Sequence, residues 1–169
     1  MNKTPMMEVL EQCSILELQI ILVNLLPREG FGDPEVLDRL RSSQKTRHGG
    51  FEMICRRTTS FLQQTTLVKV VNDNVRQRMV CEMAGQVDLN GADWGLIVTP
   101  RKVCKSAREA LHVIARSKVH VIDGRGLERL LRKHRIGIRR DDSVDYELFL
   151  ELYQFASLLE PGERIPWMN

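Results

Sequence analysis

Residues 94–99, Trp-Gly-Leu-Ile-Val-Thr, form the stretch of sequence that decides the fold. The run is almost entirely apolar, which is typical of a parallel or central strand that is buried on both faces of a sheet. Two further runs, residues 65–71 and residues 118–122, are rich in β-branched residues and predict strands as well. Residues 51–56 predict a shorter strand, entered through Gly49-Gly50. The sequence therefore predicts a sheet of four strands.

Helical spacing of apolar residues alternates with these strands. The first helical pattern spans residues 8–26 and contains a capping-box pattern, Ser14 with Glu17. The Pro- and Gly-rich segment 27–34 is expected to end that helix. Further helices are predicted over residues 75–87, 106–115, 126–134 and 146–159, with a loop or short helix over residues 35–48 and a turn over residues 57–64.

The order α-β-β-α-β-α-β-α, followed by one more helix, predicts an α/β fold. We expect an open mixed sheet flanked by helices, with an additional C-terminal helix. One domain is predicted over residues 1–140, and an acidic helical extension is predicted over residues 141–169.

Composition excludes several classes of protein. The chain has 169 residues, 43% hydrophobic and 28% charged, which is an ordinary globular mixture and argues against a disordered or fibrous chain. No apolar run approaches the ~20 residues that a membrane span needs, and the first twelve residues lack the apolar core of a secretory signal. We therefore expect a cytoplasmic protein. The four cysteines contain no Cys-x-x-Cys pair, which argues against a zinc cluster or a disulfide framework and predicts buried free thiols: Cys13, Cys55, Cys81 and Cys104.

Charge is distributed unevenly along the chain. Residues 1–100 carry 11 Lys and Arg against 12 Asp and Glu, a net charge of −1, whereas residues 101–140 carry 13 against 3, a net charge of +10. Residues 141–169 carry 1 against 7, a net charge of −6. A concentrated positive surface attracts polyanions. The basic block therefore favours contact with nucleic acid over a merely solvated helix face. The acidic tail is expected either to fold back on this block or to repel stray anions.

Several successive motifs resemble the second half of an Mrr-type restriction endonuclease domain. In that family a strand ends in Val-Thr-Thr, a helix carries a Lys-x-Ala-x-x-x-Ala core, a strand ends in Ile-Asp-Gly, and a helix carries paired leucines. The corresponding segments here are residues 91–100, 104–110, 119–124 and 127–131. Upstream, residues 80–85 and the Gly30-Phe31 turn resemble the family's preceding helix and opening turn. The resemblance covers residues 12–140.

The resemblance implies a PD-(D/E)xK nuclease fold and hydrolysis of DNA phosphodiesters with a divalent metal ion. In the family, an Asp in a Gly-Gly-x-Asp turn and an acidic residue or Gln two positions before a Lys form the site, often with a Glu from the first helix. Mg²⁺ prefers such hard oxygen ligands, polarises the phosphate and activates the attacking water. The lysine stabilises charge that develops at the phosphorus.

The family positions are only partly retained in this chain. Gly49-Gly50-Phe51-Glu52 matches the first element with Glu52 as the expected Mg²⁺ ligand, and Lys69 matches the catalytic lysine. Leu67 replaces the acidic residue or Gln, and Gln19 stands where the helical Glu is expected. The predicted catalytic residues are therefore Glu52, Lys69 and Gln19, with Mg²⁺ as cofactor only if the site is active. Glu17 or Glu82 remains an alternative source of a second carboxylate.

Within the basic block, two groups of residues are predicted to contact DNA phosphates. Arg101, Lys102 and Lys105 follow one strand and open a helix, where the helix N-terminus also favours anions. Arg125, Arg129, Arg132 and Lys133 belong to the next basic helix, in which the first three fall along one outer face. Such contacts position double-stranded DNA without reading its sequence. With 5% aromatic residues, composition does not suggest stacking of bases on aromatic side chains.

Three functions remain open at this point. We favour a DNA-binding domain with an eroded nuclease site. The first alternative is an active, Mg²⁺-dependent DNA endonuclease of the restriction or defence type. The second is a non-catalytic interaction subunit whose C-terminal helix contacts a partner or a second copy, through Phe149, Phe155 and Trp167, instead of covering its own sheet.

Overall fold

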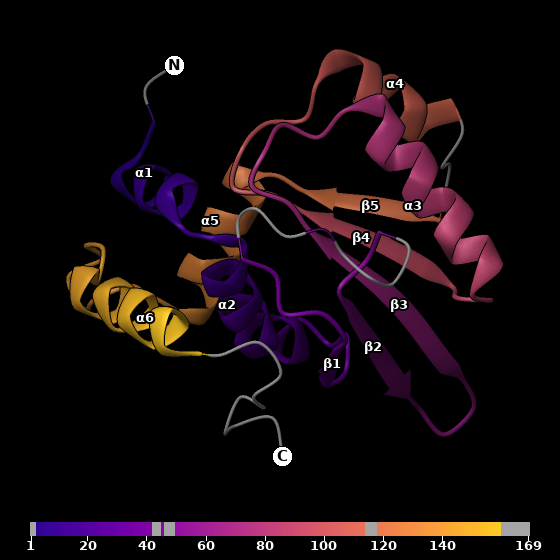
Figure 1. The fold of residues 1–169 in the computed structure, drawn as a ribbon. Helices are drawn as coiled ribbons and strands as arrows, with labels where there is room; N and C mark the ends of the chain where they lie inside the picture. Colours follow the sequence, from indigo (N-terminus) through magenta and orange to yellow (C-terminus); the bar gives the residue numbers. More distant parts are fainter. Residues whose placement is uncertain (1–2, 42–44, 46–49, 114–117, 160–169) are drawn as a thin grey trace.

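The computed structural model describes residues 3–41, 45, 50–113 and 118–159. Its elements (Figure 1) are α1 (Pro5–Gln12), α2 (Ile15–Arg28), β1 (Pro34–Val36), β2 (Met53–Thr58), β3 (Gln63–Val70), α3 (Gln77–Leu89), β4 (Trp94–Val98), α4 (Lys105–Val113), β5 (Val119–Ile122), α5 (Gly124–His134) and α6 (Tyr146–Leu158).

The strands form one mixed sheet in the order β1-β2-β3-β4-β5. The first three strands pair antiparallel, and β3, β4 and β5 pair parallel. The two parallel connections contain α3 and α4, as crossovers between parallel strands require. The predicted open mixed sheet flanked by helices is therefore confirmed.

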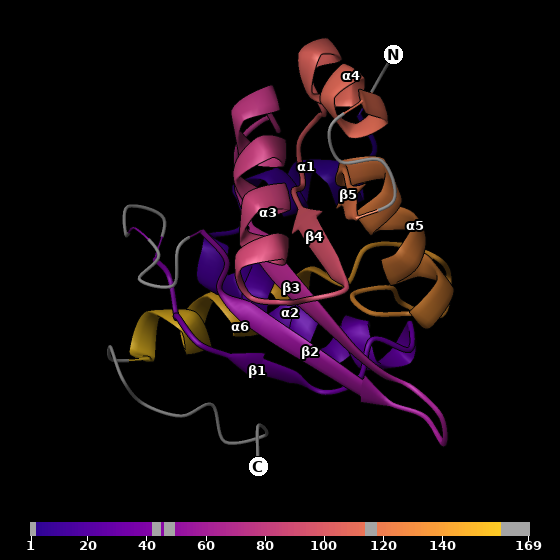
Figure 2. The ribbon, with the colours of Figure 1, turned by 90° about the vertical axis from the view of Figure 1, so that its right-hand side faces the viewer.

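Helices cover both faces of the sheet (Figure 2). Apolar residues of α1, α2 and α5 pack with Val68 and Val70 of β3 in what we call the first core. Residues of α3 and α4 pack on the other face with Leu67 of β3 in the second core. Successive residues of a strand point to opposite faces, which explains why neighbours on β3 belong to different cores.

The opening helix differs from the expected single helix over residues 8–26. It is divided into α1 and α2, which meet at an angle of 120°. Ser14 causes the division, because its side chain accepts a hydrogen bond from Glu17 N at 3.2 Å while Glu17 Oε2 accepts one from Ser14 N at 2.7 Å. This capping box, which the sequence predicted, begins α2 at Ile15. The second helix runs through Pro27 and ends before Gly30, whose φ is +83°.

Two further differences concern the sheet. Residues 34–36 were expected to belong to the segment that ends the first helix and to a loop or short helix, but they form β1, which is too short to show an alternating pattern in sequence. The predicted turn over residues 57–64 narrows to residues 59–62, where Thr59 N donates to Leu62 O at 2.8 Å. As a result, Arg57 and Gln64 are cross-strand partners within the sheet rather than turn residues.

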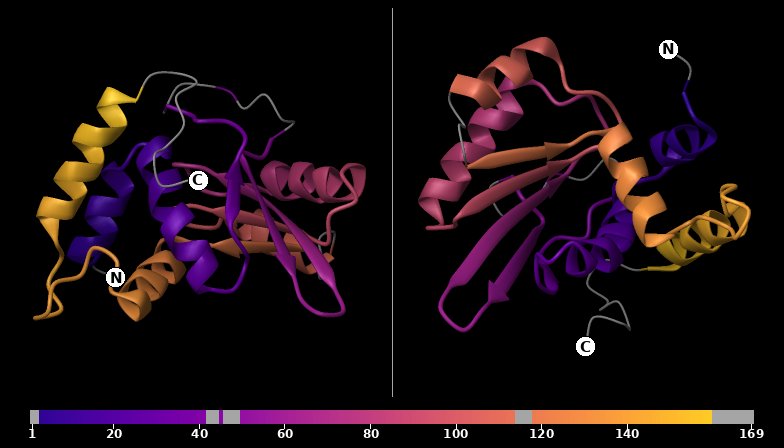
Figure 3. Two further views of the ribbon diagram at one scale, coloured as in Figure 1. Left: turned by 90° about the horizontal axis from the view of Figure 1, so that it is seen from below. Right: turned by 180° about the vertical axis from the view of Figure 1, so that it is seen from behind.

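The C-terminal helix covers another helix and not the sheet (Figure 3). Ala156 of α6 and Leu159 pack on Leu16 and Ile20 of α2. The acidic tail was expected either to fold back on the basic block or to repel anions, and its first residues, 142–147, do fold back on the block. The ion pairs are Arg135 with Asp142 at 3.2 Å, Arg139 with Asp145 at 3.6 Å and Arg139 with Glu147 at 3.4 Å.

All four cysteines are free, as predicted, with Cys13 and Cys55 buried and the other two half-buried. Over the described ranges, no single helix is long and apolar enough to cross a membrane. Only α1 and α2 taken together have the length and apolar composition of a membrane span, and the two helices are bent by 120° relative to each other.

Substitution of Gly124 by alanine is expected to destabilise the fold. A Cβ at this position would lie 2.1 Å from the backbone oxygen of Pro100, so the contact between α5 and the segment after β4 has no room for a methyl group. Overpacking of this kind lowers the free energy of unfolding by about 1–3 kcal/mol. Gly85→Ala in α3 is the control, because a Cβ there meets nothing within 4 Å; it should raise stability by about 0.5–1 kcal/mol. Urea denaturation of both variants measures these changes, and equal effects would contradict the assignment.

Candidate active site

Glu52 precedes β2 and is only 2% exposed. Its backbone N donates to Val68 O at 2.9 Å, and its backbone oxygen accepts from Leu37 N at 2.7 Å. Its side-chain Oε2 accepts from Val70 N at 2.7 Å. The residue is therefore held by strands on both sides, and its carboxyl lies beside the end of β3.

Burial raises the pKa of the Glu52 carboxyl from 4.5 to about 8. The hydrogen bond from Val70 N and the charge of Lys69 lower this pKa, while the nearby Asp38 carboxylate raises it. Desolvation dominates because the charged form loses more hydration than these partners return. At neutral pH the carboxyl is therefore largely protonated.

Lys69 lies beside Glu52 on β3, with its side chain 13% exposed. Its Nζ lies 3.8 Å from Glu82 Oε2 on α3, and a Cβ placed on Gly50 would approach it to 3.4 Å. Gly50 has a φ of +111°, so this position requires glycine for its backbone and leaves space for the ammonium group. Gly49, the other glycine of the motif, lies outside the described residues.

The structure thus brings together Glu52 and Lys69, two of the three predicted catalytic residues. Gln19 is fully buried on α2, where its Nε2 donates to Asp38 O at 2.8 Å and its Oε1 accepts from Leu40 N at 3.3 Å. Both ends of its amide are used to hold the segment 38–40. Through that segment Gln19 positions Asp38, whose backbone N donates to Glu52 O at 3.3 Å.

Among the alternative carboxylates, Glu17 is engaged in the capping box of α2, whereas Glu82 contacts Lys69. Glu82 also accepts a hydrogen bond from Arg78 Nε at 2.6 Å. Asp38 is the acidic residue that the sequence did not indicate, since it lies in a segment without a motif. The structure identifies Asp38 by its place beside Glu52, where its backbone N donates to Glu52 O and its charge raises the Glu52 pKa.

The side chains around Glu52 and Lys69 do not fit a magnesium ion. No group of three His, Cys, Asp or Glu side chains within the described part of the chain could hold a metal. Leu67, at the position of the family's second ligand, is 1% exposed and packs in the second core. Glu52 favours its neutral form, and Mg²⁺ requires several hard, charged oxygen ligands in near-octahedral geometry.

Three of the predicted DNA-contacting residues meet in one cavity of about 560 Å³. Arg101, Lys102 and Arg125 line it together with Lys3 and Arg108, which the sequence did not single out. We call it the basic cavity; it lies where β4 and β5 end. The carboxylate in its lining, Asp123, caps α5 by accepting from Gly126 N at 2.9 Å.

The basic cavity lies on the same edge of the sheet as Lys69. Val75 N donates to Lys102 O at 2.9 Å, and Lys102 N donates to Asn74 Oδ1 at 3.2 Å. The segment that follows Lys69 in the chain is thereby joined to the segment that lines the cavity. In open sheets with parallel strands, ligands bind at this carboxyl edge.

The other predicted cations do not line the cavity. Lys105 lies 3.9 Å from Glu109, Arg132 lies 3.0 Å from Glu128, and Lys133 lies 2.7 Å from Glu29. Arg129 is exposed on α5. The predicted basic surface is therefore divided between the basic cavity, where Lys3 and Arg101 pair with Glu11, and α5, where Arg132 and Lys133 are paired.

The stability of the protein should fall between about pH 5 and pH 8 through Glu52. A carboxyl with a folded-state pKa of about 8 and an ordinary value of 4.5 binds more protons in the folded state over this range. Its contribution is complete below pH 4.5 and is lost as the pH rises through 8. One proton accounts for at most about 1.4 kcal/mol per pH unit. Urea denaturation in chelated buffer should show a flatter pH dependence for Glu52→Gln than for the wild type, and identical slopes would contradict the assignment.

Comparison with known proteins places this geometry in a family. Residues 10–131 match the family model Mrr_cat, described as a restriction endonuclease. The structure is similar to MspJI restriction endonuclease in complex with a 27-mer oligonucleotide, with 16% identity, a TM-score of 0.58, and coverage of 89% of this chain and 33% of that one. It is also similar to the DNA modification-dependent restriction endonuclease AspBHI, with 14% identity, a TM-score of 0.56, and coverage of 94% and 42%. No curated protein sequence matches the chain significantly.

At these identities the two structures establish the fold alone. The chain spans a third and about two fifths of the length of these neighbours. The family model, in contrast, matches well over half of the sequence and includes Glu52, Lys69 and all the lining residues of the basic cavity except Lys3 and Met7. The chain therefore belongs to the Mrr_cat restriction endonuclease family.

Proposed function

We propose that this chain is a DNA-binding domain of the restriction endonuclease fold whose nuclease centre is eroded. The observation that carries the proposal is the burial of Leu67, which occupies a ligand position and is 1% exposed in the second core. A packed leucine at that position offers no oxygen donor to a metal ion. A single desolvated carboxyl is a poor ligand for Mg²⁺.

The basic cavity supports contact with double-stranded DNA. Five cationic side chains and one carboxylate line it, and that carboxylate is engaged in capping α5. Lys3 and Arg101 also pair with Glu11, at 2.6 Å and 3.9 Å, so the cavity keeps an excess of positive charge. Arginine and lysine in such a position neutralise backbone phosphates and bind without regard to sequence. One structural neighbour was solved with an oligonucleotide and another is described as dependent on DNA modification, which makes DNA the partner that we propose here. We also propose a cytoplasmic location.

A second candidate function is active, metal-dependent cleavage of DNA. The favouring observation is that Glu82 and Asp38 add carboxylates close to Lys69 and Glu52 respectively. In this alternative, substrate phosphates supply ligands that the protein lacks, and Lys69 stabilises the charge on phosphorus.

A third candidate, a protein-binding subunit, is favoured by α6. Leu150, Tyr153 and Leu158 of this helix are 56%, 61% and 76% exposed. Apolar side chains of this kind are available to a second copy or to another protein. The sequence indicated other residues for this role: Phe149 is instead buried in the first core, Phe155 packs partly buried against α2, and Trp167 lies outside the described residues.

DNA binding should depend steeply on salt, and the basic cavity should account for part of the slope. Anisotropy titration of a labelled duplex with the double variant Lys102→Gln and Arg125→Gln should lower the slope of log K against log salt by about two, since each phosphate contact contributes about one. Lys133→Gln is the matched control, because Lys133 already pairs with Glu29. Binding that is absent, or equally affected by both changes, would contradict the assigned surface.

A plasmid-nicking assay with Mg²⁺ and with Mn²⁺, on the same protein preparation, distinguishes DNA cleavage from DNA binding alone. We expect no nicking by the wild type. Nicking that disappears in Lys69→Ala but persists in Arg78→Ala would establish the active enzyme instead. Arg78 is a suitable control because it contacts the same Glu82 and its side chain is 89% exposed. If the wild type neither binds the duplex nor nicks the plasmid, both DNA functions are excluded and the protein-binding function is the one supported.

A further inference from the structure

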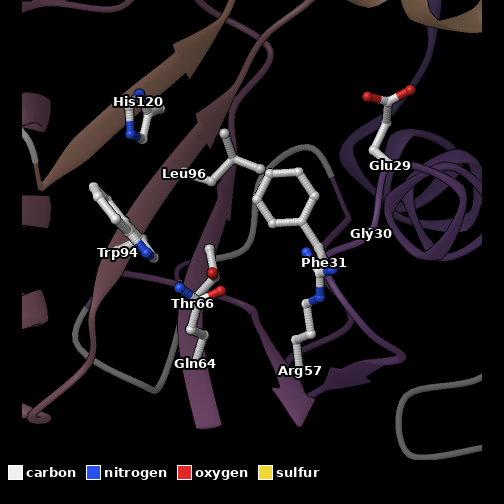
Figure 4. A pocket seen from close by; sticks show the side chains of 10 residues that line it. Glu29, Gly30, Phe31, Arg57, Gln64, Thr66, Trp94, Leu96 and His120 are labelled. Carbon is white, nitrogen blue, oxygen red and sulfur yellow. The ribbon is translucent and has the colours of Figure 1, made fainter. Parts of the chain in front are cut away.

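A second cavity, of about 330 Å³, opens at the edge of the sheet where β4 and β5 begin. It lies on the face of the sheet that carries the first core, beyond the end of α2 (Figure 4). We call it the aromatic cavity, because three of its lining residues are Phe31, Trp94 and His120. Nothing in the proposed function uses this part of the molecule.

The strand register explains why the lining side chains converge. Arg57 pairs with Gln64, Thr66 pairs with Trp94, and Leu96 pairs with His120. Cross-strand partners point to the same face of a sheet, and so do residues two apart on one strand. All six side chains therefore share one face. Thr66 and Leu96 are buried and form the floor.

Aromatic rings stand on two sides of this floor. The rings of Trp94 and His120 lie with centroids 5.3 Å apart and planes inclined by 42°. Phe31 stands on the other side of Leu96 and Thr66, as Figure 4 shows. It is placed there by the turn after α2, in which Gly30 has a φ of +83°. Rings on two sides of an apolar floor suit a flat, aromatic ligand.

The rim of the cavity is polar and carries positive charge. The side chains of Arg57 and Gln64 have no hydrogen-bond or ion-pair partner among the described residues, so their donors and acceptors are available. Arg57 Nη1 lies 3.5 Å from the position of a Gly30 Cβ, at the side of the turn that carries Phe31. The carboxylate of the lining, Glu29, is engaged by Lys133 at 2.7 Å and by His134.

We infer that the aromatic cavity binds a nucleotide. Its base would stack against Trp94 and Phe31, the Gln64 amide would pair with the polar edge of the base, and Arg57 would hold the phosphate. A cationic ligand is disfavoured because Arg57 is unpaired while Glu29 is neutralised. The volume lies at the lower end of the range of small-molecule sites, about 300–1,000 Å³, and suits one nucleotide rather than a larger ligand.

This site is distinct from the candidate active site. Lys69 follows Gln64 by five residues on β3, a separation of about 17 Å at the rise of a strand. The side chain of Lys69 also points to the opposite face, toward α3. The nucleotide has two possible sources with the same chemistry: a free mononucleotide, or a single unpaired nucleotide of a DNA strand.

Trp94 itself reports on occupancy. In a Trp167→Phe background Trp94 is the sole tryptophan, since the chain has two. AMP and CMP should quench its fluorescence saturably in the millimolar range or below. Arg57→Gln should weaken binding of the mononucleotides by about ten-fold, because a charge-assisted hydrogen bond to phosphate is lost, and should leave the nucleosides unaffected.

Arg56→Gln is the matched control for this measurement. Arg56 neighbours Arg57 on the same strand, but it points to the opposite face and pairs with Glu35 at 2.5 Å. The inference is overturned if no ligand quenches Trp94 saturably, if inorganic phosphate alone reproduces the effect, or if the two arginine variants behave alike. Both arginines are exposed, so neither variant is expected to impair folding.

Two DNA duplexes distinguish the sources of the nucleotide. Quenching by a duplex with one bulged nucleotide, but not by its fully paired counterpart, assigns the cavity to an extrahelical base of DNA. Quenching by mononucleotides alone assigns it to a free ligand. Both results support the inference. The double variant Lys102→Gln and Arg125→Gln should leave mononucleotide quenching unchanged, so a failure of the proposed DNA binding does not decide this test.

Discussion

The alternation of side chains along β3 is the constraint on which the rest of the structure depends. The strand pairs antiparallel with β2 and parallel with β4, so it joins the two halves of the sheet. Val68 and Val70 point into the first core, and Leu67 points into the second. Lys69 must then emerge on the same face as Leu67, at the border of the second core, where Gly50 leaves room for its ammonium group. A shift of one residue in register would exchange the two cores and move Lys69 to the opposite face.

Desolvation decides the chemical character of the Glu52–Lys69 pair. Burial raises the pKa of Glu52, so the packing that encloses this carboxyl disfavours its charged form. Gln19 adds to this closure, because it uses its whole amide to hold the backbone of segment 38–40. Leu67 and Gln19, which the resemblance places at polar positions of the nuclease centre, thus pack in a core and hold backbone, and this is the physical basis for the erosion that we propose.

The two cavities lie at opposite edges of the sheet and differ in chemical character. At the carboxyl edge of the parallel strands, Lys102 and its neighbours form the basic cavity close to the segment that follows Lys69. At the other edge, the sheet extends beyond the end of α2 and leaves an aromatic cavity uncovered. The acidic segment before α6 neutralises Arg135 and Arg139, so the net charge of the basic block overstates the positive charge available to a ligand. Exposed ion pairs of this kind add little to the free energy of unfolding. They reduce the positive charge that Arg135 and Arg139 offer to an anion.

The sequence by itself determined the four strands other than β1 and the capping box at Ser14, and its resemblance to the family indicated Glu52, Leu67 and Lys69. These features are local, since they follow from the period of apolar residues or from spacing within a few residues. Only the tertiary structure decided that Asp38 lies near Glu52, that Lys3 and Arg108 join the basic cavity, and that Phe31 stands across a cavity from Trp94. Each of these depends on contacts between segments far apart in the chain. Such contacts are set by strand register and by the placement of helices on the sheet, which no local pattern encodes.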